Sequence, residues 1–106
     1  MVQESKELQH GHPKFYKLLE EIGKHHSERN AYYATDANPL SNFIEGAKLL
    51  NITPAAYALA LSTKQYLGVI ENLRRGTLTA KRNREHLLDI AVYSLLTIIL
   101  LEEKAE

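Results

Sequence analysis

The fold is decided by the last apolar stretch of the chain, 81-KRNREHLLDIAVYSLLTIILLEEK-104. Leucine, isoleucine, valine and alanine surround its middle on almost every side, which is typical of a helix that lies centrally in a bundle or at a subunit interface. Its longest apolar run, 87–101, includes Asp89, Ser94 and Thr97. That run is too short and too polar to span a membrane.

Caps, breakers and apolar spacing predict further helices upstream of this segment. The first covers 13–31, opens at Pro13 and has an apolar face of Phe15, Leu18, Leu19 and Ile22. A short second helix is capped by Asn38, opens at Pro39, and ends at Leu50 with Asn51 as a left-handed stop.

The third helix is predicted between Pro54 and Arg75, with Thr53 as its cap and Gly76 as its stop. One of its faces carries Ala55, Leu59, Ser62, Tyr66, Val69, Ile70 and Leu73. The sequence therefore predicts an all-α protein, a compact bundle of three long helices and one short helix. Apolar faces left over on so small a core favour completion by oligomerisation.

Composition bounds the classes of function. The chain has 106 residues, 13 basic and 13 acidic side chains, 44% hydrophobic residues and no cysteine. Disulfides, thiolate catalysis and cysteine-bound metals are therefore excluded. Zero net charge disfavours binding to nucleic acid or to a membrane through bulk charge. We expect a flexible tail at 1–11 and a single domain at 12–106; the N-terminal MVQESKELQHGH has no apolar run, so a cytoplasmic protein is predicted.

A polar line interrupts the apolar last helix. It consists of Arg82, His86, Asp89, Tyr93 and Thr97, at steps of three and four residues. A carboxylate among so many apolar neighbours is costly unless it is paired, hydrogen-bonded or bound to a cation. Glu85 and Asp89 could supply oxygen ligands to Mg²⁺ from consecutive turns. Alternatively, Asp89 pairs with an arginine or lysine of another helix while Tyr93 holds it.

A second stripe, Glu21, His25 and Glu28, borders the apolar face of the first helix. It could face a cleft and add carboxylates to the same metal, or it could simply be the solvated side of the helix. A basic cluster surrounds the last connection and could hold phosphates; it consists of Arg74, Arg75, Lys81, Arg82 and Arg84. The alternative is a helix end stabilised by cations. Lys64 and Gly68 share a second face of the third helix, where close packing is expected at the glycine.

Five short segments, in their order along the chain, resemble a family of small helical proteins of phages and bacteria: 12-HPKFYKLLEEI-22, 28-ERNAYY-33, 38-NPLSNF-43, 50-LNITP-54 and 85-EHLLDIAVY-93. That family is similar to the MazG-like all-α nucleotide pyrophosphohydrolases and to the nucleotide-modification-associated domains. The resemblance covers about 12–103. It implies a helical bundle that assembles as a dimer or tetramer, Mg²⁺ held by carboxylates of two helices, and hydrolysis of a nucleoside triphosphate between its α and β phosphates.

The resemblance also assigns roles to residues. Asn30 and Tyr33 match the Asn and Tyr of the family's K-N-x-D-Y turn, and Lys64 matches a lysine of the penultimate helix. Glu85 and Asp89 match the acidic pair of the last helix and are the predicted catalytic residues. The predicted metal ligands are Glu21, Glu28, Glu85 and Asp89. The predicted substrate-binding residues are Asn30, Tyr33, Lys64, Arg82, Arg84 and Tyr93.

Three departures from the family pattern weaken the implied metal site. Tyr32 and Thr63 stand where the family has aspartates, and Lys24 follows Glu20-Glu21 where an intact E-E-x-x-E signature has an acid. Two functions therefore remain open. One is a Mg²⁺-dependent pyrophosphohydrolase or a nucleotide-binding relative with degraded activity. The other is a non-catalytic assembly module of phage origin, with 98–101 at a subunit interface. A nucleic-acid-binding regulator is disfavoured by zero net charge and the short basic cluster.

Overall fold

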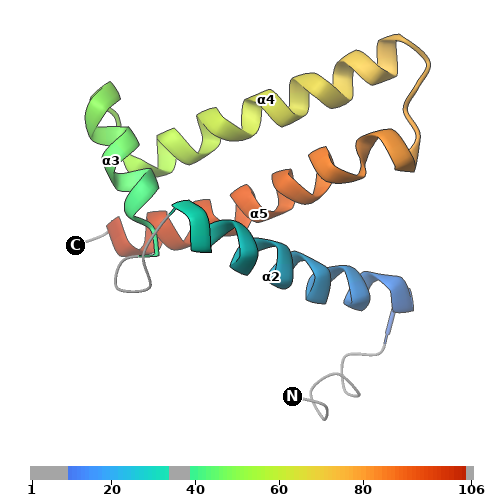
Figure 1. Cartoon of the computed structure of the whole chain (residues 1–106), viewed down its shortest axis with the longest axis horizontal. Helices are drawn as coiled ribbons and strands as arrows, with labels where there is room; N and C mark the ends of the chain where they lie inside the picture. Colours follow the sequence, from blue (N-terminus) through green and yellow to red (C-terminus); the bar gives the residue numbers. More distant parts are fainter. Residues whose placement is uncertain (1–9, 34–38, 105–106) are drawn as a thin grey trace.

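The computed structural model describes residues 10–33 and 39–104, and within these ranges it contains helices joined by turns and no strand. The elements are α2 (Pro13–Tyr33), α3 (Ser41–Leu50), α4 (Pro54–Arg74) and α5 (Ala80–Lys104), as Figure 1 shows. For this part of the chain, the prediction of three long helices and one short helix is confirmed. Most of the predicted tail at 1–11 lies outside the described residues, as does the loop before Pro39.

Local signals explain where the helices end. Thr53 caps α4, because its Oγ1 accepts a hydrogen bond of 3.1 Å from the backbone N–H of Ala56. Asn51 adopts the predicted left-handed conformation with φ 59°, and Gly76 after α4 has φ 73°. The predicted start of α3 is wrong. The helix begins at Ser41 instead of Pro39, since the Leu40 carbonyl accepts its first hydrogen bonds; Asn38, the predicted cap, lies outside the described residues.

The helices pack around a hairpin of α4 and α5, with α3 against the first turns of α4 and α2 alongside α5 (Figure 1). The buried apolar cluster lies at the end of the hairpin that α3 covers, and it consists of Leu40, Phe43, Ala55, Ala58, Leu96 and Leu100. Phe43 is at its centre, with edge-to-face ring contacts to Tyr57 at 6.4 Å and to Tyr93 at 6.3 Å. These contacts fix α3 against both helices of the hairpin.

The opposite end of the hairpin is closed by polar side chains. Asn83 is only 1% exposed. Its amide group donates to the carbonyls of Thr77 and Thr79 and accepts a 2.9 Å hydrogen bond from Asn72. A buried amide is stable when its hydrogen bonds are made, as they are here. This arrangement was not predicted from the sequence.

Large apolar surfaces remain uncovered on the described chain. Figure 1 shows α2 diverging from α5 toward its N-terminal end, and Phe15, Leu18 and Leu19 are exposed there. The predicted single face of α4 divides: Ala55 and Ser62 are buried and Val69 is partly buried, whereas the other large side chains on it are exposed. The Cα radius of gyration is 15.8 Å, above the value of about 13 Å that is usual for a compact domain of this length.

None of the described helices is long and apolar enough to cross a membrane.

Candidate functional site

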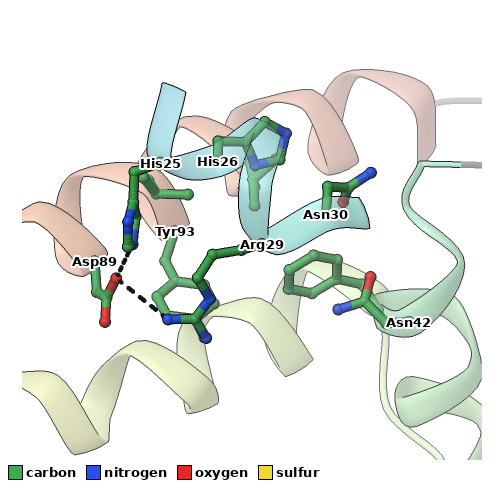
Figure 2. A pocket seen from close by; sticks show the side chains of 10 residues that line it. His25, His26, Arg29, Asn30, Asn42, Asp89 and Tyr93 are labelled. Atoms are coloured by element: carbon green, nitrogen blue, oxygen red, sulfur yellow. Dashed lines mark hydrogen bonds and ion pairs between the residues drawn. The ribbon is translucent and has the colours of Figure 1, made fainter. Parts of the chain in front are cut away.

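A pocket of about 60 Å³ opens where α2, α3 and α5 meet (Figure 2). Helix α2 contributes His25, His26, Arg29 and Asn30, and α3 contributes Asn42 and Phe43. From α5 come Asp89, Val92, Tyr93 and Leu96. The pocket is therefore built by segments from both ends of the chain, with polar groups at its two sides and an apolar wall between them.

Asp89 lies at one side of the pocket, and its side chain is only 15% exposed. His25 contacts it through Nε2 at 3.1 Å from Oδ1, and Nη1 of Arg29 lies 3.9 Å from the same oxygen. His25 and Arg29 are one turn apart on α2, so both point toward α5 (Figure 2). A carboxylate this far from water needs compensation, and these two side chains supply it.

The other side of the pocket is formed by the first turn of α3. Asn42 lies there, next to Phe43 in the core. Its Oδ1 atom is buried and has no hydrogen-bond partner within the described part of the chain. Figure 2 shows the Asn42 side chain across the pocket from Asp89, with the Arg29 side chain between them.

Three of the predicted site residues line this pocket: Asn30, Asp89 and Tyr93. Glu21 and Arg84 do not, because they bind each other. Arg84 makes two hydrogen bonds to the Glu21 carboxylate, one of 2.7 Å between Nη2 and Oε1. These hydrogen bonds lower the pKa of Glu21 and raise the pKa of Arg84. A predicted metal ligand and a predicted phosphate ligand thus neutralise each other at the surface.

The remaining predicted residues lie outside the pocket. Glu28, Lys64, Arg82 and Glu85 have exposed side chains that do not line it. Tyr33 is the last residue of α2, and its side chain lies outside what the structure describes. Among the described residues, no three His, Asp or Glu side chains are grouped so that they could hold a metal ion. The Mg²⁺ site therefore stays a prediction.

The residues of the polar line of α5 contact different partners, and so do those of the basic cluster. His86 faces α4, with Nδ1 2.6 Å from Gln65 Oε1, and it packs against the predicted close approach at Gly68. Thr97 is buried and donates to the Tyr93 carbonyl. In the basic cluster, Glu71 pairs with Arg75 at 2.8 Å and with Arg74 at 3.5 Å. Neither set forms one surface for a ligand.

Among the polar side chains that line the pocket, His26, Arg29 and Asn42 belonged to no predicted site or polar stripe. Arg29 had a local signal, since it lies one turn after His25, which the polar stripe of the first helix includes. For Asn42, the only signal in the sequence was its position beside the apolar Phe43. Comparisons of the chain with protein-family models, curated proteins and solved structures find no match.

Proposed function

We propose that this protein binds nucleotides in the pocket between α2, α3 and α5, as a relative of the MazG-like enzymes with degraded hydrolytic activity. The observation that carries the proposal is the convergence of Asn30, Asp89 and Tyr93 from distant parts of the chain onto one pocket. The resemblance matches Asn30 and Asp89 to site residues of the family, and Tyr93 belongs to the substrate-binding residues predicted from the sequence. Arg29 adds a cation whose side chain is 47% exposed, so it can meet an anionic part of a ligand.

Hydrolysis with Mg²⁺ is not supported by the donor set. Mg²⁺ in nucleotide enzymes is held by one or two carboxylates together with substrate phosphates. Here Asp89 already contacts His25 and Arg29, and Glu21 is paired with Arg84. The residues present therefore do not fit a preformed magnesium site. The expected activity is binding with little or no release of pyrophosphate.

A nucleotide panel tests this function. The full chain is incubated with the four ribo- and four deoxyribonucleoside triphosphates, with and without Mg²⁺, while affinity and pyrophosphate release are measured. We expect at least one nucleotide to bind and Arg29→Met to weaken it by about tenfold, the loss typical of a charged hydrogen bond. Arg82→Met, which removes an exposed arginine outside the pocket, is the matched control. Failure of every nucleotide to bind would exclude this function.

The measurement of pyrophosphate release tests whether the protein retains hydrolytic activity. Rapid release that requires Mg²⁺ and disappears in Asp89→Asn would show that the carboxylate acts in a metal-dependent reaction. That result would overturn the proposal of degraded activity, while binding in the pocket would stand.

The second candidate, an assembly module, is favoured by one specific observation. Leu59, Thr63, Tyr66, Ile70 and Leu73 alternate at four and three residues along α4, and all five are exposed. Such alternation is the pattern of a helix that packs lengthwise against another helix. We call these five residues the α4 seam. A second copy of the chain, with its α4 antiparallel, presents the same seam in reverse order and could cover it.

The molecular mass in solution tests the assembly. We expect the protein to elute and scatter light as a dimer or larger oligomer, and Ile70→Glu in the middle of the seam to reduce the mass to that of one chain. Leu49→Glu is the control, because Leu49 on α3 is 86% exposed and lies outside the seam. A wild-type monomer, or equal loss of mass in both variants, would contradict the α4 seam as the interface.

A further inference from the structure

Oδ1, the side-chain amide oxygen of Asn42, is an unsatisfied hydrogen-bond acceptor in the described part of the chain. It is buried and has no hydrogen-bond partner there. A buried acceptor without a donor costs free energy, which a ligand donor can recover. Asn42 lines the pocket, so a molecule in the pocket lies next to its side chain.

The walls next to Asn42 are largely apolar and include two aromatic rings. Phe43 and Tyr93 pack edge to face with their centroids 6.3 Å apart, and Val92 and Leu96 extend the same wall. The volume of the pocket is about 60 Å³, far below the 300–1,000 Å³ of pockets that enclose a drug-sized ligand. The pocket can therefore enclose one small part of a nucleotide, and the rest must lie outside.

A phosphate group of the nucleotide fits this pocket poorly. Asp89 is buried at one side of the pocket and the Asn42 oxygen at the other, and both repel phosphate oxygens. Arg29 and His25 already contact Asp89, so part of the local positive charge is neutralised. A group that presents an N–H donor is attracted to both sides.

We propose that the pocket receives the nucleobase, with an N–H of the base donating to Asn42 Oδ1 and the base lying against Phe43 and Tyr93. This inference rests on the proposed nucleotide binding and adds which part of the ligand enters. The amide of an asparagine can make two hydrogen bonds to the edge of a base, accepting through Oδ1 and donating through Nδ2. The phosphates then lie on the solvent side of the pocket, where the half-exposed Arg29 can meet them, and binding needs no divalent ion.

Binding of nucleosides without phosphates tests the inference. The full chain in buffer with EDTA is titrated with adenosine, guanosine, cytidine and uridine, and separately with inorganic triphosphate, by calorimetry and by thermal shift. We expect at least one nucleoside to bind and triphosphate alone not to bind. We expect the nucleoside to lose roughly tenfold or more of its affinity in Asn42→Ala, which removes the carbonyl without filling the pocket.

Asn42→Leu gives a second readout with the opposite sign. It removes the unsatisfied acceptor, so the unfolding midpoint of the free protein should rise while nucleoside binding is lost. A purely structural asparagine would lower the midpoint when replaced. Glu45→Gln is the control, since Glu45 lies on the same helix with a 71% exposed side chain, and it should change neither quantity.

The outcomes separate this inference from the proposed function. If nucleoside triphosphates bind but nucleosides do not, or if Asn42→Ala binds as wild type does, the base lies elsewhere and only the nucleotide proposal stands. If inorganic triphosphate binds as tightly as a nucleotide, the pocket recognises phosphate and the inference is wrong. If neither nucleosides nor nucleotides bind, both proposals fall.

Discussion

Asp89 is a carboxylate within the most apolar helix, and its environment shows how a costly residue is accommodated. Its charge is met by a hydrogen bond from His25 and by the Arg29 guanidinium, both on α2. The sequence predicts that such a residue needs a partner, because desolvation of an unpaired carboxylate is unfavourable. It does not predict which partner, since His25 lies 64 residues away in sequence and no local periodicity relates the two positions.

Replacing Asp89 tests this compensation. Asp89→Asn removes the charge and leaves His25 and Arg29 with a weaker acceptor, so the free energy of unfolding should fall by about 1–3 kcal/mol. Urea denaturation followed by circular dichroism measures the change. Glu85→Gln one turn earlier alters an exposed carboxylate and should change stability by less than about 0.5 kcal/mol. Equal effects of the two substitutions would contradict this account of Asp89.

The pair of Glu21 and Arg84 makes a prediction about pH. The hydrogen bonds from Arg84 lower the pKa of Glu21 below its ordinary value of 4.5. A group of this kind stabilises the folded state above its ordinary pKa, and the contribution disappears as pH falls through the lowered value. Glu21→Gln should therefore unfold at slightly lower urea concentration than wild type at neutral pH, and the difference should vanish well below pH 4.5.

Urea midpoints of the wild type and the variant, measured from neutral pH down to about pH 3, follow this difference. Glu20→Gln changes the neighbouring exposed carboxylate of α2 and is the control. A constant difference between wild type and Glu21→Gln across the whole range would mean that the carboxylate charge does not matter.

At the scale of the helices, most ends were predicted well, although α3 begins at Ser41 instead of Pro39, and the packed faces were not predicted. Thr53, Asn51 and Gly76 act on backbone groups within a few residues of themselves, so their effect can be read locally. Leu59 and Ala55 both lie on apolar positions of α4, yet only Ala55 is buried. Which apolar stripe is covered depends on helices that are distant in sequence. For the same reason, only some of the residues that line the pocket were predicted.

Two glycines in helix interiors give opposite predictions. At Gly68 an added Cβ would lie 2.8 Å from Nε2 of His86, whose ring is held by Gln65. Gly68→Ala should therefore destabilise the protein by about 1 kcal/mol, because overpacking outweighs the gain in helix propensity. Gly23→Ala meets no atom within 4 Å, so it should stabilise by about 0.5–1 kcal/mol.

Thermal and urea unfolding of the two glycine variants measure both the expected loss and the expected gain of stability. Stabilisation by Gly68→Ala as large as that by Gly23→Ala would show that His86 moves away without cost and that α4 and α5 are not tightly packed there.

At the scale of the whole molecule, a single chain leaves much of its apolar surface in water. The α4 seam, the first turns of α2 and an outer face of α5 that includes Leu87, Ile98 and Leu101 are exposed. Monomeric proteins rarely leave large contiguous apolar patches uncovered. The extended shape, with a radius of gyration of 15.8 Å, agrees with a chain whose core is shared.

If folding is coupled to association, stability depends on protein concentration. We expect the midpoint of thermal unfolding to rise by roughly 5 °C when the concentration is raised a hundredfold, because association draws the equilibrium toward the folded state. Differential scanning calorimetry measures the midpoint. The Ile70→Glu variant should lose this dependence, whereas a wild-type midpoint that is constant with concentration would mean that each chain is stable alone.

The polar closure of the α4–α5 hairpin has a consequence for the order in which the chain acquires its structure. Asn72 and Asn83 meet across only 11 residues, whereas His25 and Asp89 meet across 64. Short loops close at lower entropic cost and more quickly than long ones. We expect the hairpin to form early during folding and α2 to dock last. Brief detachment of α2 would then dismantle the pocket while the hairpin keeps its amide protons protected from exchange.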